Sequence, residues 1–263
     1  MTNCGKNNHM QLTLIKQSTN AASVSTLADQ GWHLEIPAGK RGGYRLAQLD
    51  DYANRSRKDF LWHPPLTTTL LARASYKDIP GTWGFGLWND PFSLSLGLSG
   101  GVRRFPALPN TAWFFHASLE NHLSFQKDKP AQGFLAQTFN SPPMPPGLLA
   151  LAAPVFPLLT LPWIAKRIRP VIARVIKDDS TSIYLDVTQW HQYALQLEQS
   201  LVRFKIDNVE IFQTKVAPIS PLGFVIWIDN QFASFPPTGK LAYGTMENSR
   251  PAWIEVKQIE IIK

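Results

Sequence analysis

The sequence has one cysteine, Cys4, among 263 residues. A single thiol cannot close an intrachain disulfide, and it cannot supply a cysteine cage for a metal ion. The six histidines are scattered, with no H-x-H or H-x-x-x-H spacing and no carboxylate at ligand spacing. We therefore expect no transition-metal site and no cofactor, apart from a structural calcium whose oxygen ligands a sequence cannot place.

Targeting and nucleic-acid signals are also scarce. Before Lys16 the chain has only a six-residue, partly apolar run, which is too short for the apolar region of a secretory signal. We therefore expect a cytoplasmic protein, in line with the near absence of cysteine. The formal charge is +7, but the basic residues form no groove with interleaved aromatics and match no recognised module, so nucleic acid is not an expected partner. No phosphate-binding glycine loop and no G-x-S-x-G motif stands in the strand-and-helix context that such motifs need.

Turn formers and aromatics are plentiful. The chain is 44% hydrophobic, with 21 Pro, 16 Gly and 9 Trp. This composition is typical of one large all-β domain with many turns. Nine tryptophans exceed what a core of this size needs, and indole rings suit flat ligands such as sugar rings.

Alternating strands are predicted through most of the sequence. They fall at WHLEIP, YRLAQLDDY, LTTTLLARAS, GTWGFGLW, NTAWFFHAS, GFLAQTF, SIYLDVT, LAYGT and AWIEVKQIEIIK, and the last of these slips near Lys257 and Gln258, as at a bulge. In GTWGFGLW, glycines alternate with large residues, which indicates a close approach by a ligand or by the opposing sheet. Residues 1–30 are polar and are expected to be a tail or an edge strand, leaving 31–263 as the domain.

The stretch from Trp190 to Asn230 looks like the organising element. Two alternating strands flank an Asp207-Asn208 turn, and the apolar strand PLGFVIWIDN follows. We expect this hairpin and the WID segment to lie side by side in a curved inner sheet. If Phe224, Ile226 and Ile228 face the other sheet, Trp227 and Asp229 face the concave side.

Residues 140–179 interrupt the strand pattern. An uncharged run of eighteen residues containing several prolines is followed by KRIRPVIARVIK, in which apolar residues recur at helical spacing. Five cations lie in this stretch: Lys166, Arg167, Arg169, Arg174 and Lys177. We expect a helical insertion packed over the sandwich, with an in-plane membrane contact through 148–177 as the alternative. A transmembrane span is disfavoured by the prolines.

The order of these segments resembles the concanavalin A-like lectin and glucanase superfamily, most nearly the laminarinase-type enzymes of glycoside hydrolase family 16. GTWGFGLWND resembles the aromatic strand that precedes those enzymes' catalytic strand. WHQYALQLEQSLVRFKIDNVEIFQT is similar to their hairpin, PLGFVIWIDN to the inner strand, and AWIEVKQIEII to the closing strand. The resemblance covers residues 31 to the end without the insertion, and it implies an all-β jelly-roll sandwich with a saccharide site on its concave face.

The chain departs from that family where the chemistry would lie. The family carries E-x-D-x-x-E or E-x-D-x-E on one strand, which sets an acid and a nucleophile about 5 Å apart. This chain has no E-x-D pair, and NTAWFFHAS, in the matching place, has no carboxylate. Whether it is an enzyme therefore stays open, with Asp229, His116 and Glu120 as the candidate acids or bases.

Three functions remain open at this point. The first is saccharide binding, without hydrolysis or as an atypical glycosidase, through Trp83, Trp88, Asn89, Asp90, Trp113, Trp227 and Asn230. The second is a cyclase or lyase acting on an apolar substrate beneath the insertion. The third is peripheral membrane or lipid binding through residues 148–177. The oligomeric state cannot be inferred.

Overall fold

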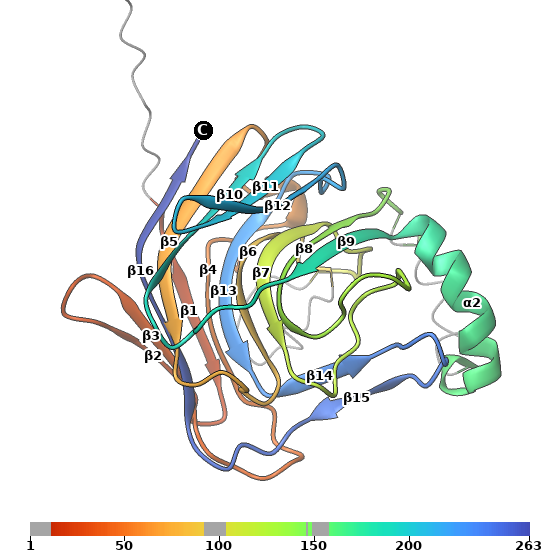
Figure 1. Ribbon diagram of the computed structural model, residues 1–263, viewed down its shortest axis with the longest axis horizontal. Coiled ribbons are helices and arrows are strands. Elements are labelled where there is room, and N and C mark those ends of the chain that lie inside the picture. The colour runs from red at the N-terminus through yellow and green to blue at the C-terminus, as the bar shows by residue number, and fades with distance from the viewer. Residues whose placement is uncertain (1–11, 92–103, 146, 149–157) are drawn as a thin grey trace, which may run out of the picture.

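Two seven-stranded antiparallel sheets pack face to face in the computed structural model, which describes residues 12–91, 104–145, 147–148 and 158–263 (Figure 1). The prediction of an all-β jelly-roll sandwich is confirmed. Cys4 and residues 149–157 of the uncharged run lie outside the described residues.

The first sheet, sheet A, has the strand order β1-β4-β13-β6-β7-β8-β9. Its strands are β1 (Ile15–Thr19), β4 (Leu46–Asp50), β13 (Gly223–Asp229), β6 (Thr82–Trp88), β7 (Thr111–Ala117), β8 (Gly133–Asn140) and β9 (Lys177–Ser182). The four strands β13, β6, β7 and β8 are buried along almost their whole length. Both faces of sheet A are therefore covered there, whereas an antiparallel sheet often leaves one face to water.

The second sheet, sheet B, has the order β12-β11-β10-β5-β16-β3-β2. Its strands are β12 (Val209–Thr214), β11 (Val202–Ile206), β10 (His191–Leu197), β5 (Leu66–Ala74), β16 (Ala252–Ile262), β3 (Trp32–Ile36) and β2 (Ser23–Thr26). In β5 buried and half-buried residues alternate strictly, so sheet B presents only one face to the core. The expected slip in β16 is present as a register shift between Lys257 and Glu260.

The Asp207-Asn208 turn forms as predicted, with φ of 49° and 66° at its two residues. Positive φ at both positions is the signature of a type I′ hairpin turn. The predicted pairing of this hairpin with the WID segment is wrong, however. The hairpin belongs to sheet B and β13 to sheet A, because the connection after Thr214 crosses between the layers. Strand alternation shows which face of a strand is buried but not which strand is its neighbour.

Two further boundaries differ from the expected ones. Residues 15–19 and 23–26, inside the segment expected to be a tail or an edge strand, form the edge strands β1 and β2, which pair with β4 and β3. The strand predicted at SIYLDVT lies earlier in the chain, as β9, and so begins within the predicted insertion. β9 is rich in polar residues, and its pairing with β8 outweighs its weak local strand preference.

The rest of the insertion contains the helix α2 (Pro162–Val175), which lies on the side of sheet A away from sheet B, beside β9 and the hairpin of β14 (Gln231–Ser234) and β15 (Ala242–Thr245) (Figure 1). Pro170 sits inside the helix. The buried side of α2 holds Ala165 and Arg169. The Arg169 guanidinium donates to the carbonyl oxygens of Phe235 (3.0 Å) and Ser124 (2.6 Å), so the helix is attached to two separate loops. In the described part of the chain, no helix has the length and apolar character needed to cross a bilayer.

The main core lies between the sheets. Its largest fully buried side chains include Trp62, Trp83, Phe114, Tyr193 and Phe204. A second apolar cluster lies on the other face of sheet A, toward α2. This second cluster is where the candidate site lies.

Candidate functional site

The face of sheet A that points away from sheet B is the concave face, and neighbouring strands bring its residues into rows. One row runs from Gln48 through Trp227, Gly84 and Phe115 to Leu135. The next row toward the strand ends contains Leu46, Asp229, Thr82 and Ala117, and the row on the other side contains Asp50, Val225, Gly86, Trp113 and Gln137. As predicted, Phe224, Ile226 and Ile228 point into the intersheet core while Trp227 points the opposite way.

Four aromatic side chains from three adjacent strands form the floor of this face: Trp88, Trp113, Phe115 and Trp227. The Trp113 ring centroid lies 5.2 Å from that of Trp227, 5.1 Å from that of Phe115 and 6.0 Å from that of Trp88. The Trp88 and Trp227 rings are parallel, with centroids 6.3 Å apart. Offset and tilted contacts at these distances are the favourable arrangements for aromatic rings.

Glycines in β6 make room for these rings. A Cβ atom on Gly84 would lie 2.9 Å from the Trp227 ring, and one on Gly86 would lie 2.7 Å from the Trp113 Cβ. The glycines predicted to mark a close approach therefore accommodate the neighbouring strand and its indoles. A ligand is not what they make room for.

Asp229 lies at one end of the floor and is buried. Its Oδ1 accepts from the Thr82 hydroxyl (2.7 Å) and from the Gln231 backbone N–H (3.2 Å), and the Tyr44 hydroxyl also bonds the carboxyl group. Trp227 Nε1 donates to the same Thr82 oxygen (3.0 Å). Burial raises the pKa of Asp229 to about 7, although these hydrogen bonds oppose the shift. The group therefore changes charge near neutral pH.

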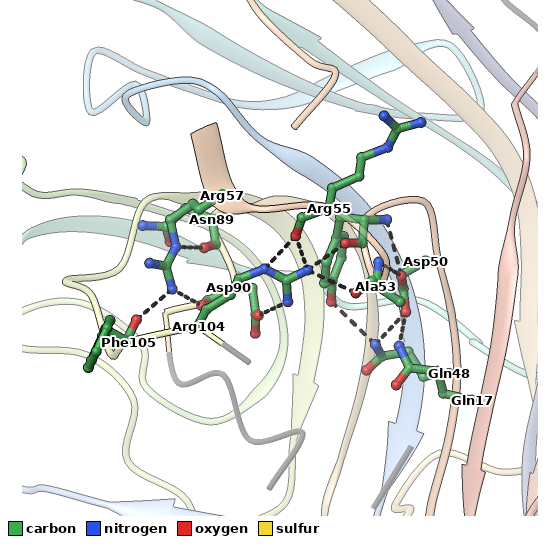
Figure 2. Close-up of polar contacts among 11 residues, drawn as sticks. Gln17, Gln48, Asp50, Ala53, Arg55, Arg57, Asn89, Asp90, Arg104 and Phe105 are labelled. Atoms are coloured by element: carbon green, nitrogen blue, oxygen red, sulfur yellow. Dashed lines mark hydrogen bonds and ion pairs between the residues drawn. The ribbon is translucent and has the colours of Figure 1, made fainter. Parts of the chain in front are cut away.

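A second buried carboxyl, Asp50, lies toward the other end of the face (Figure 2). Its Oδ1 accepts the backbone N–H groups of Tyr52 (3.1 Å) and Ala53 (2.7 Å), while its Oδ2 accepts from the amides of Gln48 (2.9 Å) and Gln17. Burial raises its pKa despite these four donors. The carboxyl fixes the turn after β4 and orients both glutamine side chains.

Beyond Asp50, an arginine cluster closes this end of the site (Figure 2). Arg104 forms a buried ion pair with Asp90 (2.8 Å), donates to the Ala53 carbonyl oxygen (3.2 Å), and lies over the Tyr52 ring at 5.4 Å. Arg57 donates to the carbonyl oxygens of Asn89 (2.6 Å) and Asp90 (2.8 Å). The two guanidinium groups thus join the loop after β4 to the loop after β6.

Several predicted site residues do meet on this face. Trp88, Trp113, Trp227 and Asp229 come together, with Asp90 at the arginine cluster. Three of the four predicted stacking residues therefore share one surface. Asp90 is already paired with Arg104, and burial raises its pKa even so.

Trp83 and His116 lie elsewhere, which corrects the expected site. Trp83 is in the intersheet core, and His116 stacks on it at 5.6 Å with 5% of its surface exposed. His116 Nε2 bonds the Ile79 carbonyl oxygen (3.1 Å), and burial lowers the pKa of the ring to about 4. Trp83 lies an odd number of residues from Trp88 in β6, and His116 lies an odd number from Trp113 in β7. Both side chains therefore point to the opposite face of sheet A, away from the concave face.

Three other predicted residues have structural surroundings. The Asn89 amide bonds the backbone of Leu108 and Asn110, and the Asn230 amide bonds the backbone of Arg45, Gly43 and Met246. Both side chains are thereby used in holding turns. Glu120 lies on an exposed turn after β7. None of the three faces the floor as a free polar group.

Sequence reasoning missed several polar partners: Tyr44, Gln48, Asp50, Thr82, Gln137 and Arg104. Gln137 is fully buried in β8, accepts from Trp113 Nε1 (3.2 Å) and donates to the Leu123 carbonyl oxygen (2.9 Å). The alternation of LAQLDD predicts that Gln48 and Asp50 point to the same face of their strand. The sequence did not predict the pairing of β4 with β13, which brings these two residues to Trp227.

Among the residues that the structure describes, no three His, Cys, Asp or Glu side chains are grouped as they would be around a metal ion. A calcium site built partly from backbone oxygens stays a prediction.

The sequence matches no family model and no curated protein. Among solved structures, the chain is similar to a family 16 endo-glucanase from Bacteroides ovatus, with 12% identity and a TM-score of 0.47 over 96% of this chain and 97% of that one. It is similar to an endo-β-galactosidase from Clostridium perfringens that releases GlcNAcα1-4Gal, with 11% identity and a TM-score of 0.44 over 92% of this chain and 54% of that one. It is also similar to a sialidase, with 10% identity and a TM-score of 0.42 over 94% of this chain. The chain spans only 16% of that sialidase and about half of the galactosidase. These values establish no family.

Proposed function

We propose that the concave face of sheet A binds a saccharide and does not hydrolyse it by the two-carboxylate mechanism. The observation that carries this proposal is the floor of Trp88, Trp113 and Trp227, three indole rings from three adjacent strands on the face that does not pack on sheet B. Indole faces contact the apolar C–H side of a sugar ring, and a few fixed polar groups then orient its hydroxyls.

The partly accessible residues of this face lie on and just before β4 and at the end of β6. Trp113 and Trp227 are each less than a tenth exposed, whereas Trp88, Tyr44, Leu46 and Gln48 are half-buried. A sugar would stack on Trp88, with Gln48 nearby through its bond to the Tyr52 hydroxyl, whereas Tyr44 lies at the Asp229 end of the face. The amide of Gln48 and the hydroxyl of Tyr44 are suited to hydroxyl recognition, and Asp50 and Asp229 hold them in place.

The strand that would carry hydrolysis has no acid. From β7 the concave face receives Trp113, Phe115 and Ala117. Retaining hydrolysis requires two carboxyl groups about 5–5.5 Å apart and inversion requires about 6.5–9.5 Å, with one acting as acid and the other as nucleophile or base. Asp50 and Asp90 each bond several protein donors or a guanidinium, and burial raises the pKa of Asp229, on the same face, to about 7.

Replacing Trp88 by Ala tests the binding proposal. A panel of oligosaccharides is first titrated into the wild-type protein by calorimetry, and any ligand found is repeated with Trp88→Ala. Loss of the indole face should weaken binding about tenfold or more, because one aromatic contact contributes on the order of 1 kcal/mol beyond buried area. Tyr184→Ala removes an aromatic that is 93% exposed in a loop, and it should leave the affinity unchanged.

Two outcomes would contradict the proposal. If no member of the panel binds, or if Trp88→Ala binds as tightly as wild type, the indole floor is not a saccharide site. Release of reducing ends by wild-type protein would contradict the non-hydrolytic part alone.

A second candidate function is proton transfer on an apolar substrate, and the pKa of about 7 at Asp229 is the observation that favours it. A carboxyl group poised near neutrality beside an apolar floor could act as the acid or the base of a cyclase or lyase. Turnover lost in Asp229→Asn while ligand binding persists would support this second function. Equal turnover in the two proteins would rule out Asp229 as its acid or base.

A further inference from the structure

The outward side of α2 is both apolar and basic. Trp163 is 62% exposed and Val171 is 56% exposed. Lys166, Arg167 and Arg174 are exposed as well. Trp163, Arg167, Pro170, Val171 and Arg174 follow one another at intervals of one to four residues that place them on one side of a helix. We call these five residues together with Lys166 the outer face of α2.

The fold does not account for the outer face. The opposite side of the helix carries the attachment, through Ala165 and through Arg169 with its bonds to the Phe235 and Ser124 carbonyl oxygens. Lys166, Arg167 and Arg174 form no ion pair within the described part of the chain. A tryptophan and a valine this exposed add no core packing and favour association with other surfaces.

The stretch of sequence that contains the outer face carries charge of one sign. No Asp or Glu occurs in the sequence between Asp128 and Asp178, and Lys177 adds another exposed cation just after the helix. A partner must therefore be anionic and must also accept an indole and aliphatic side chains. A bilayer surface with anionic headgroups meets both requirements, because Lys and Arg remain at the phosphates while Trp enters the interface.

We propose that the outer face of α2 docks the protein on anionic membranes, with the helix lying in the plane of the interface. The face lies on the side of the molecule away from sheet B, so docking leaves both sheets folded as they are (Figure 1). A single short helix with a few cations predicts reversible binding that weakens with salt. Nucleic acid would also use the cations but would not require Trp163 to enter an apolar layer, so the membrane is the partner that explains the whole face.

Flotation of the full-length protein with vesicles tests this proposal. The vesicles are phosphatidylcholine alone and equal parts of phosphatidylcholine and phosphatidylglycerol, each at low and high salt. Wild type should float with the anionic vesicles at low salt and much less at high salt or with neutral vesicles. Arg167→Glu with Arg174→Glu should lower the partition coefficient at least about tenfold, because two cations that attract anionic headgroups become carboxylates that the headgroups repel.

Matched variants distinguish binding through the outer face from a general effect of net charge. Lys77→Glu with Lys215→Glu makes the same change in net charge at two exposed lysines on other elements, and it should bind as wild type does. Trp163→Ser should reduce the binding that persists at high salt. All of these side chains are exposed, and circular dichroism is used to check that each variant folds.

Three results would overturn the proposal. They are no flotation with any vesicle, equal loss in the two double variants, and equal binding to neutral and anionic vesicles. If there is no flotation and wild type retains a fluorescent duplex DNA, the cations serve a different polyanion. None of these results bears on saccharide binding at Trp88, which is measured without lipid.

Discussion

Asp229→Asn is expected to change how the stability of the protein depends on pH. Between pH 5 and pH 8 the wild-type free energy of unfolding should fall by about 2–3 kcal/mol more than that of the variant. The physical reason is the burial of Asp229, which raises its pKa from 3.8 to about 7 in the folded state. Asn is nearly isosteric, carries no charge at either pH, and keeps an acceptor for Thr82 and the Gln231 N–H.

The direction follows from proton linkage. Above pH 4 the unfolded chain has lost the proton of this carboxyl group, while the folded protein keeps it until about pH 7. The folded state therefore binds more protons across this window, and stability falls as pH rises through it. The contribution is fully present below the unfolded pKa and is lost once pH passes the folded value. Asp51, whose pKa burial raises to about 6, adds a trend of the same sign, but it is present in both proteins and cancels in the comparison.

Urea unfolding at pH 5, 6, 7 and 8 measures the effect. Asp29→Asn is the control, because this exposed aspartate has a pKa lowered by its bond to Lys257 and is ionised in both states throughout that range. Its stability curve should run parallel to that of wild type. If the Asp229→Asn curve is also parallel to wild type, the Asp229 carboxyl does not titrate near neutrality, and the second candidate function loses its only support.

The face that each strand buries could be predicted from alternation alone. The opposite orientations of Trp227 and Ile228 followed from a period of two, and the hairpin turn followed from the Asp207-Asn208 pair between two alternating strands. These features are local, since each depends on residues within a few positions of one another. The all-β class was readable for the same reason.

Neighbours across the sheets could not be predicted in this way. The assignment of the Asp207-Asn208 hairpin and β13 to one sheet failed because the chain crosses between the layers after Thr214. The same limit hid the partners of Asp229, since Thr82 lies 147 positions away in sequence and reaches it only through the pairing of β13 with β6.

Parity also explains the errors in the candidate site. Trp83 and His116 were grouped with Trp88 and Trp113 because they are near in sequence. Within one regular strand, however, residues an odd number apart face opposite sides: Trp83 and Trp88 differ by five, and Trp113 and His116 by three. Consistent use of the alternation that placed Trp227 would have placed Trp83 and His116 in the intersheet core.

The glycines of β6 lead to the second prediction with a large effect. Gly86→Ala should destabilise the protein by about 3–5 kcal/mol, a loss large enough to unfold many single domains. A Cβ there would lie 2.6 Å from the Trp113 Cα and 2.7 Å from the Trp113 Cβ, and the φ of Gly86 is +155°. The obstructing atoms belong to the paired strand β7, so they cannot move without disturbing the hydrogen bonds between β6 and β7.

Gly42→Ala is the matched control. Gly42 also has a positive φ, of +103°, but a Cβ on it would meet nothing within 4 Å. Its substitution should cost only about 1 kcal/mol, which is the backbone strain alone. The difference between the two variants, measured by chemical denaturation, then isolates the cost of the clash with β7.

The same pair of variants decides what the glycine is for. If Gly86 makes room for Trp113, Gly86→Ala should lose stability and should also alter the near-ultraviolet circular dichroism of the stacked indoles. If it instead leaves room for a ligand, Gly86→Ala should be as stable as Gly42→Ala and should fail only in binding. That second result would mean that Trp113 lies farther from Gly86 than the structure shows, because the Trp113 Cβ could not then be within 2.7 Å of the new methyl group.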